Sequence, residues 1–407
     1  MNSLIYADNN ATTAIAPEAM QAMLPYLRDE YFNPSSMYDP AARVAEALRT
    51  ARHEAAELIG SVPPRNLFFT SCATESNNWA IFGAAAAAPD RRHVITTAVE
   101  HPSVLEGGKE LVRRGYDVTF LGVNSRGELN LDDYVKALRP DTLIVSIMHA
   151  NNETGVLFPV AELARIAKET HPAILFHTDA TQSAGKVPID LQGDFRHVDL
   201  LSFSGHKLHA PKGVGVLFLR AGTPIRPILI GGHQESGRRA GTENVPHIVA
   251  LGAACRIARE RMKEESHIQA FRDQLEAKIL RRIPYIEING AGAPRLPNTL
   301  NLAVHFIEGE SILMQLNAYG ICASSGSACT SGSLEPSHVL KAMKVPFTAM
   351  HGSVRFSFSR YTTGAEVDRI ADLFPLTVQN LRRLSPYWDP ARNEPRRDLP
   401  SSASVRV

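Results

Sequence analysis

The sequence predicts an α/β protein with a large domain, in which a mainly parallel sheet lies between helices, and a smaller domain toward the C-terminus. Short apolar runs bounded by turn residues alternate with longer helical stretches up to about residue 220. Several runs, such as "LIVSIM" at 143–148, are almost continuously apolar, which is typical of strands covered on both faces. Beyond Pro246 the alternation gives way to one long helical pattern, which indicates a second unit.

The expected elements follow in chain order. Strands are expected at 66–71, 93–97, 117–123, 142–148, 173–180, 199–205 and 213–219, with a later one at 298–304. Helices are expected at 73–88, 102–115, 159–170 and 308–320, and a helical pattern with room for a break runs from 245 to 283. Strand, helix and strand in succession indicate an α/β fold. We place a large domain at 16–258, a small domain at 1–15 and 259–390, and a disordered, Pro- and Ser-rich tail at 391–407.

Length and charge fit an ordinary globular protein. The 407 residues provide enough chain for more than one domain. The 43 Lys and Arg residues balance 42 Asp and Glu residues, so neither nucleic acid nor a membrane is expected as a partner. The N-terminus lacks a basic region followed by an apolar one, so we expect no secretory signal and a cytoplasmic location.

One of the four cysteines has unusual neighbours. None of Cys72, Cys255, Cys322 and Cys329 belongs to a C-x-x-C pair, so neither a zinc knuckle nor a thioredoxin-like motif is indicated. Disulfides are not expected in a reducing compartment, and most of these thiols should be inert core residues. Cys329 differs because it lies in "SSGSACTSG", where seven of nine residues are Ser, Thr or Gly. We therefore expect Cys329 to be an accessible, reactive thiol.

Polar side chains cluster where the predicted strands end, which is the edge at which open α/β sheets bind ligands. Asp179 ends the strand in "FHTDATQ", and Lys207 follows the strand in "SFSGHK". Together they match the needs of pyridoxal phosphate, which requires a lysine for a Schiff base and an acid that keeps the pyridine nitrogen protonated. Its phosphate needs donors, ideally at a helix N-terminus. The candidate donors are Ala73, Thr74, Ser204 and His206.

Other lysines and other site classes fit less well. Lys212 directly precedes a strand in "APKGVG" and is expected to be a loop charge. No G-x-x-x-x-G-K-[ST] motif occurs, and "GVGVLF" lacks the third glycine of a dinucleotide fingerprint. His206 and His209 are not accompanied by H-E-x-x-H, so no intrinsic metal site is expected.

A colinear set of motifs from residue 6 to about 363 resembles the cysteine desulfurases of the NifS/IscS type, which belong to the class V aminotransferase-like enzymes. The set includes "YADNNATT", "TSCATES", "VEHPSV", "ANNETG", "FHTDATQ", "SFSGHKLHAPKGVGVL", "LPNTLN", "ASSGSACTSGSLEPSHVLKAM" and "VRFSFSRYTT". "GGHQESGRRAGTEN" and the late "SPYW" are more similar to the nitrogen-fixation branch, NifS, than to the housekeeping branch. The resemblance implies a fold-type I pyridoxal-phosphate enzyme, with a seven-stranded sheet in the large domain and a smaller α+β C-terminal domain.

The resemblance also implies a role for each matching residue. Lys207 carries the cofactor, Asp179 pairs with its pyridine nitrogen, and Gln182 hydrogen-bonds its ring hydroxyl. His101 stacks on the ring and relays protons. Arg355 binds the substrate carboxylate, which suits a guanidinium fork. The remaining implied roles are ring and substrate contact for Asn152, phosphate contact for Ala73, Thr74, Ser204 and His206, contact with the phosphate of the neighbouring subunit of a homodimer for Thr242, and nucleophilic attack for Cys329.

The implied reaction converts L-cysteine to L-alanine and leaves the sulfur on Cys329 as a persulfide. The sulfur is then used for iron–sulfur cluster assembly for nitrogenase, through a NifU-like or IscU-like scaffold protein. The only metal contact expected of Cys329 is a transient one with such a cluster. Three alternatives stay open: a housekeeping desulfurase for general clusters or thiolation, a selenocysteine lyase, and an aminotransferase of the same fold. A non-catalytic sulfur carrier is disfavoured because Asp179, Gln182 and Lys207 are all present.

Two positions depart from the family pattern. Ala73 stands where glycine is common and still offers its backbone N–H. Cys322 stands where a small non-thiol residue is usual, and its apolar neighbours favour a buried strand end. The small residues around Cys329 are expected to make that segment mobile, so that one sulfur can reach both the cofactor and an acceptor.

Overall fold

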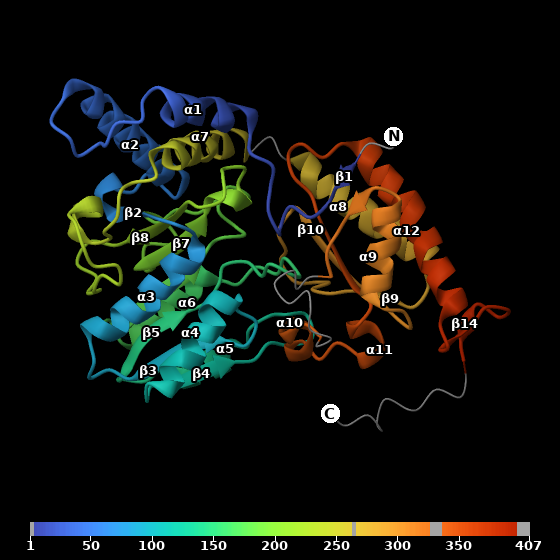
Figure 1. Cartoon of the computed structure of the whole chain (residues 1–407). Helices are drawn as coiled ribbons and strands as arrows, with labels where there is room; N and C mark the ends of the chain where they lie inside the picture. Colours follow the sequence, from blue (N-terminus) through green and yellow to red (C-terminus); the bar gives the residue numbers. More distant parts are fainter. Residues whose placement is uncertain (1–3, 263–265, 326–335, 397–407) are drawn as a thin grey trace.

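The computed structural model describes residues 4–262, 266–325 and 336–396. Figure 1 shows two bodies side by side, a larger one that contains the blue-to-green part of the chain and a smaller one built mainly from its orange-to-red part. The N-terminal strand β1 (Ile5–Tyr6) belongs to the smaller body, where it pairs in parallel with β11 (Ile321–Cys322).

The larger body is organised around a seven-stranded sheet with the strand order β2-β8-β7-β6-β5-β3-β4. In chain order its strands are β2 (Leu67–Thr70), β3 (His93–Thr97), β4 (Asp117–Leu121), β5 (Thr142–Ser146), β6 (Leu175–Asp179), β7 (Leu200–Ser204) and β8 (Gly215–Leu219). β8 runs antiparallel to both of its neighbours, and the other pairs are parallel. The expected mainly parallel, seven-stranded sheet is confirmed.

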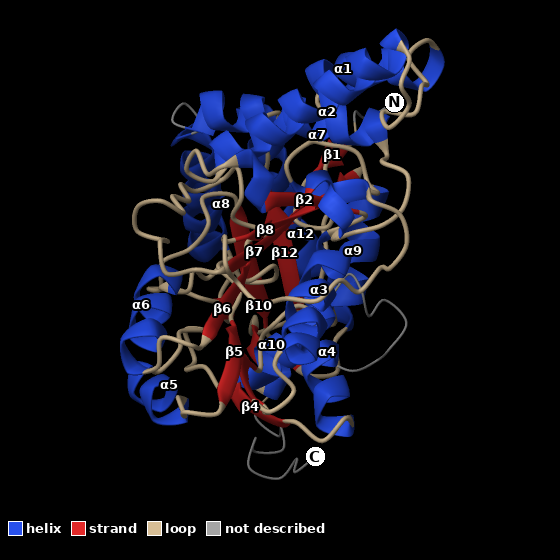
Figure 2. Ribbon diagram, turned by 90° about the vertical axis from the view of Figure 1, so that its left-hand side faces the viewer, coloured by secondary structure: helices blue, strands red, loops and turns tan. Residues whose placement is uncertain are grey.

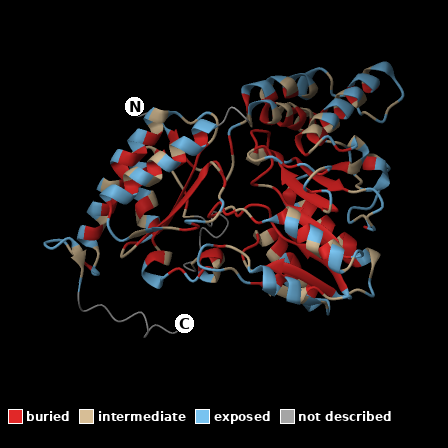
Figure 3. Cartoon of the chain, turned by 180° about the vertical axis from the view of Figure 1, so that it is seen from behind, coloured by how far each residue is buried: buried red, intermediate tan, exposed pale blue. Residues whose placement is uncertain are grey.

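Helices cover both faces of this sheet (Figure 2). The helices of the larger body are α1 (Pro17–Arg28), α2 (Asp39–Leu58), α3 (Ala73–Ala87), α4 (Pro102–Arg113), α5 (Leu131–Ala137), α6 (Val160–Thr170) and α7 (Val245–Arg261), with short 3-10 turns at η1 (Pro64–Asn66), η2 (Gly205–Lys207) and η3 (Gln234–Gly237). Trp79 of α3 joins one apolar cluster with Leu143 and Leu217 of the sheet. Leu163 and Leu251 belong to a second, larger cluster. This double cover explains why every strand except β4 is buried along its whole length (Figure 3).

The smaller body has its own core around a three-stranded antiparallel sheet with the order β12-β10-β9. Its elements are α8 (Ser266–Arg282), β9 (Ile286–Ile288), β10 (Thr299–Val304), α9 (Gly309–Ala318), β12 (Ser353–Ser357) and α12 (Gly364–Leu384). Leu275, Leu302 and Phe374 lie in this core. Two short helices, α10 (His338–Ala342) and α11 (Phe347–Met350), contribute side chains to the core of the larger body instead. The limits that we assigned to the two domains stay a prediction.

The long helical pattern after Pro246 forms two helices, α7 and α8, in agreement with the room left for a break. The end of the chain differs from the expectation. Near the C-terminus, β13 (Trp388–Asp389) pairs antiparallel with β14 (Glu394–Pro395). Residues 391–396 therefore form part of a hairpin, although the sequence suggested that a disordered tail begins at 391. Trp388 is buried there beneath the Arg382 guanidinium, so its aromatic surface holds this end of the chain in place.

The sheet brings several polar chain segments to one edge. Asp179 ends β6 and Ser204 ends the adjacent strand β7, while α3 begins three residues after β2 ends. Gly215, at the start of β8, lies so close to this helix start that a Cβ on it would be 2.6 Å from the carbonyl carbon of Cys72. The glycine thus allows the N-terminus of α3 to lie against the sheet edge.

Candidate active site

A cavity of about 320 Å³ lies at this edge and is lined by residues from both bodies. It brings together ten of the residues expected from the sequence, namely Ala73, Thr74, His101, Asn152, Asp179, Gln182, Ser204, His206, Lys207 and Arg355. These residues come from six separate stretches of chain, so the fold gathers them and no single motif does. Thr242 lines a different cavity, with Phe69 and Arg239. Cys329 lies outside the described residues.

The ammonium group of Lys207 is held by the N-terminal segment. Its Nζ donates to the carbonyl oxygens of Asn10 and Ala11, both at 2.6 Å. Lys207 ends the 3-10 turn η2, which directly follows β7. The turn and the N-terminal segment thus fix the amine at the cavity wall, where a carbonyl group of a ligand can reach it.

A buried hydrogen-bond chain connects Asp179 to His101. Nδ2 of Asn77 donates to Oδ2 of Asp179 at 2.7 Å and to Oγ of Ser103 at 2.8 Å. Ser103 Oγ lies 2.9 Å from Nδ1 of His101. The other carboxylate oxygen of Asp179 accepts the backbone N–H of Thr181 at 2.8 Å. The chain therefore fixes the acid and the imidazole relative to each other.

His101 is the N-cap of α4, and this position defines its tautomer. Its Nδ1 accepts the backbone N–H of Ser103 at 3.2 Å, so the proton of the neutral ring must reside on Nε2. Burial, opposed in part by the Asp179 charge, lowers the pKa of His101, and the ring is neutral at physiological pH. In this state His101 offers a donor at Nε2, while its acceptor nitrogen is already engaged by Ser103.

The opposite end of the cavity can receive a phosphate. The first turn of α3 presents the backbone N–H groups of Ala73 and Thr74, and a helix N-terminus attracts anions. Oγ of Ser204 is buried and has no hydrogen-bond partner among the described residues. Burial and the nearby Lys207 charge lower the pKa of His206 to about 4, so His206 is a neutral hydrogen-bonding group here. Its Nδ1 lies 3.1 Å from Oγ1 of Thr12.

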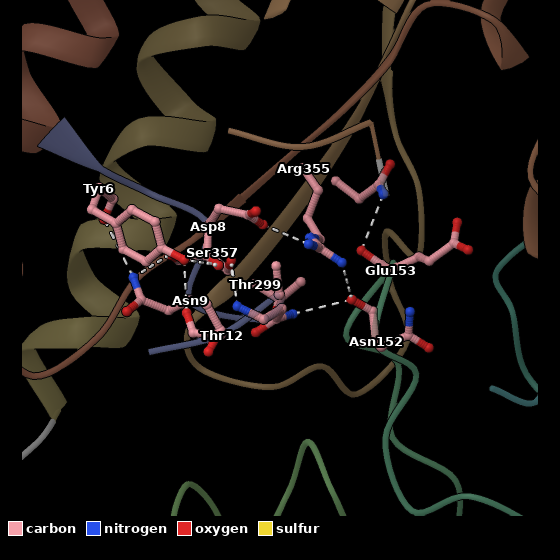
Figure 4. Close-up of polar contacts among 12 residues, drawn as sticks. Tyr6, Asp8, Asn9, Thr12, Asn152, Glu153, Thr299, Arg355 and Ser357 are labelled. Carbon is pink, nitrogen blue, oxygen red and sulfur yellow. Dashed lines mark hydrogen bonds and ion pairs between the residues drawn. The ribbon is translucent and has the colours of Figure 1, made fainter. Parts of the chain in front are cut away.

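Arg355 lies at the wall formed by the smaller body (Figure 4). Its Nη2 donates to Oδ1 of Asp8 at 2.6 Å, and Nη1 donates to the carbonyl oxygen of Asn152 at 2.8 Å. Only 1% of Arg355 is exposed to solvent, so these contacts leave the guanidinium little freedom to move. Asn10 reaches the same carbonyl of Asn152 through its Nδ2 at 3.2 Å. A fixed, buried guanidinium of this kind is suited to bind a carboxylate.

Comparison with known proteins assigns this arrangement to a family. Residues 5–370 match the model of the aminotransferase class-V family. The chain is 53% identical over 385 residues to cysteine desulfurase NifS of Azotobacter vinelandii, covering 94% of this chain and 95% of the other. A cysteine desulfurase of a Nostoc species is 52% identical over 389 residues, with 95% of each chain covered.

The chain belongs to the cysteine desulfurase family. The fold leads to the same family, because a solved NifS-like protein superposes with a TM-score of 0.86 at 38% identity, covering 93% of this chain and all of the other. Cysteine desulfurases of the aminotransferase class-V family depend on pyridoxal phosphate, and the expected cofactor is thereby confirmed.

The donor set of this desulfurase fits that cofactor. The cavity offers an amine at Lys207, a carboxylate at Asp179, and at the phosphate end the α3 N-terminus together with the partnerless Ser204 hydroxyl. Gln182 is placed less simply: its Nε2 donates to the Asn10 carbonyl at 3.0 Å, while its Oε1 accepts from Lys186. Its expected contact with the ring hydroxyl stays a prediction, as do the individual roles of the other site residues.

The described cysteines differ in their surroundings. Cys72 lines the cavity just before α3, a position that was not expected for it from the sequence. Cys255 is buried in α7, and burial raises the pKa of its thiol. Cys322 lies in β11, where burial and then the Asp8 charge raise its thiol pKa. A raised pKa reduces the thiolate fraction, so neither Cys255 nor Cys322 is suited to act as a nucleophile.

Several residues of the site escaped sequence reasoning. Asn77 lies in "TESNNW", where nothing local distinguishes it from Asn78. The same holds for Asp8, Asn10 and Ser103. Their hydrogen bonds to Arg355, Lys207 and Asn77 join residues that are far apart in the sequence and meet only in the folded chain. The other such residues are Glu153 and His338, which line the same cavity.

Within residues 4–262, 266–325 and 336–396, no helix is both long and apolar enough to cross a bilayer. The same ranges contain no cluster of three or more His, Cys, Asp or Glu side chains placed to hold a metal ion.

Proposed function

We propose that this protein is a pyridoxal-phosphate-dependent cysteine desulfurase that converts L-cysteine to L-alanine and takes the sulfur onto Cys329 as a persulfide. One observation carries the proposal: Lys207, Asp179 and Arg355 line a single cavity. The curated relatives at 52% and 53% identity, which are cysteine desulfurases, support it.

The residues around the cavity divide the work. When bound, pyridoxal phosphate supplies an electron sink for the bonds at the α-carbon of the amino acid. Lys207 is the proposed acceptor of the α-proton, because two carbonyl oxygens hold its Nζ at the cavity wall. Arg355, fixed by Asp8 and Asn152, is the proposed partner of the substrate carboxylate. Arg355 thereby orients the amino acid before any bond is broken.

The sulfur step needs a thiolate. Cys329 attacks the substrate sulfur, the sulfur–sulfur bond forms, and the carbon–sulfur bond breaks with its electron pair left on carbon. Addition of a proton to that carbon completes L-alanine. L-cysteine and the enzyme thiol thus become L-alanine and an enzyme persulfide, with no external oxidant or reductant.

We further propose a homodimer and a protein acceptor for the sulfur. Thr242 lies away from the cavity of its own chain, which suits contact with a second subunit. Ile228, Leu229 and Ile230 are exposed nearby in sequence, with Ile230 at 91%, and such an apolar stretch favours a protein partner. The NifS relative supports delivery to a NifU-like or IscU-like scaffold for nitrogenase clusters. A chemistry based on free thiols suits the cytoplasm.

The test is the formation of alanine from L-cysteine without any keto acid. A desulfurase produces L-alanine and sulfide in equal amounts under reducing conditions, whereas an aminotransferase needs the keto acid and a sulfur carrier produces neither. Cys329→Ala should abolish sulfur release, and Lys207→Ala should remove the cofactor absorbance band that depends on the lysine. Undiminished activity of Cys329→Ala, or an unchanged band in Lys207→Ala, would overturn the respective role.

A further inference from the structure

A third histidine, besides His101 and His206, lines the active-site cavity. His338 is the first residue of α10 and lies nine residues after Cys329 in the sequence. Its imidazole shares the cavity with His101, Lys207 and Arg355. The sequence did not single it out, because a histidine after a serine at a helix start is unremarkable by itself.

One hydrogen bond fixes the tautomer of His338. Its Nε2 lies 2.9 Å from the backbone carbonyl oxygen of Glu100. A carbonyl oxygen can only accept, so Nε2 must carry the proton. In the neutral ring Nδ1 is then an acceptor, and it has no hydrogen-bond partner among the described residues. His338 therefore carries a free lone pair at the cavity.

The start of α10 is held firmly by the larger body. Ser337 Oγ donates to Oε2 of Glu153 at 2.5 Å and accepts the backbone N–H groups of Val339 and Leu340. Ser337 and Glu153 are both buried, and Leu340 is part of the large apolar core. The imidazole is thus attached to the rigid wall that also carries Glu100 and His101.

Two histidines of the cavity, His101 and His338, have opposite tautomers. Nδ1 of His101 is engaged by the backbone of Ser103, which leaves His101 only a donor. His338 has the reverse arrangement, with its donor engaged and its acceptor free. A base must accept a proton, so of these two rings only His338 can do so without first breaking a hydrogen bond.

We propose that His338 is the base that accepts the proton of the attacking thiol in the desulfuration reaction. The inference rests on the proposed function, because the attacking thiol must enter this cavity to reach the substrate sulfur. The proton moves from that thiol to Nδ1 of His338, and the thiolate forms the sulfur–sulfur bond as the carbon–sulfur bond breaks. One proton is then added to the carbon that lost the sulfur, which completes the methyl group of alanine and balances the proton taken from the thiol.

Charged and titratable groups surround the ring of His338. The buried carboxyl group of Glu153 interacts electrostatically with His338, and Glu100 contributes the carbonyl that holds Nε2. His101, Lys207, Arg355 and Asp179 face the same cavity.

The main test replaces His338 by Gln in the full-length holoenzyme. The glutamine amide can still donate to the Glu100 carbonyl, but it cannot accept a proton near neutral pH. We expect single-turnover alanine formation at pH 7 to slow by about 100-fold, in the range typical of general-base catalysis. The rate of His338→Gln should rise with pH up to the thiol pKa, while the wild-type rate levels off earlier. Added imidazole should partly restore His338→Ala.

A second readout does not depend on turnover. Alkylation of Cys329 by iodoacetamide at pH 7, followed by mass spectrometry, reports its thiolate fraction. We expect alkylation to slow by about tenfold in His338→Gln, because the thiol loses its proton acceptor. His267→Gln, an exposed histidine of α8, is the matched control and should behave like the wild type in both assays.

Three results would overturn the inference: a single-turnover rate of His338→Gln within threefold of the wild type, an unchanged alkylation rate, or a loss of activity that is independent of pH and insensitive to imidazole. The last result would assign His338 a purely structural role. Failure of the wild-type enzyme to form alanine would instead refute the proposed function, so the two failures can be told apart.

Discussion

Replacing Asn77 by alanine tests the buried chain between Asp179 and His101. The change removes the hydrogen bond to the Asp179 carboxylate at 2.7 Å and the one to Ser103 at 2.8 Å. A bond to a charged acceptor contributes about 1.5–3 kcal/mol and a neutral one about 0.5–1.5 kcal/mol. Removing Oδ1 of Asn77, a buried acceptor without a partner among the described residues, offsets part of this loss. We expect a net destabilisation of about 2 kcal/mol.

The assay is urea unfolding of the cofactor-free protein, with Asn78→Ala as the matched control. Asn78 is the next residue of α3, and its Nδ2 donates to the carbonyl of Thr74 near the helix surface. Losing this hydrogen bond should lower the free energy of unfolding by no more than about 0.5 kcal/mol. Asn77→Ala should also weaken cofactor binding, since Asp179 and His101 lose their common support. Equal stabilities of the two variants would refute the importance of the chain.

Three further predictions concern other charged or reactive groups. Burial raises the pKa of Glu100 to about 8, so the folded protein keeps a proton that the unfolded chain loses above about pH 4.5. The free energy of unfolding should therefore decrease as the pH rises toward 8. In urea titrations at pH 5 and pH 8, Glu100→Gln should remove about 3–5 kcal/mol of that decrease. An equal fall in both proteins would contradict this. Arg355→Lys removes the guanidinium that Asp8 and Asn152 hold in place. The value of kcat/KM for L-cysteine should then drop by about 10- to 100-fold, mainly through a higher KM. An unchanged KM would argue against carboxylate binding by Arg355. Cys322→Ser should keep sulfide release within about twofold of the wild type, because the raised thiol pKa already makes Cys322 unreactive, and a large loss would show that it takes part.

Most of the fold could be predicted because the sheet strands are marked by simple patterns. β3 occupies the expected residues 93–97, and β6 and β7 lie within one to two residues of the expected ends. Helices α1, α2 and α12 were not assigned. The buried face of α2 consists largely of alanine, and α1 and α12 each contain an internal proline, Pro25 and Pro375, which is unusual inside a helix. The hairpin at β13 and β14 was missed for another reason: its stability comes from Trp388 contacting Arg382, which is a tertiary interaction.

The site could be predicted where a residue has a chemical function and follows a strand, as Lys207 and Asp179 do. Residues that act by supporting others carried no such signal. Asn77 is identical in type to its neighbour Asn78, and only the fold makes one buried and the other half-buried. The expected role of His101 as a proton relay stays a prediction. For the proton of the attacking thiol, the tautomers set by Ser103 and Glu100 favour His338, which no pattern in the sequence could have revealed.

The central claim is that L-cysteine becomes L-alanine while its sulfur moves to Cys329. Its most direct test is a single turnover of the reconstituted enzyme with L-cysteine labelled at sulfur, followed by mass spectrometry of the peptide that contains Cys329 and by measurement of alanine. The account predicts one labelled sulfur atom on Cys329 for each alanine formed. Alanine without labelled sulfur on that peptide, or labelled sulfur on another cysteine, would contradict it.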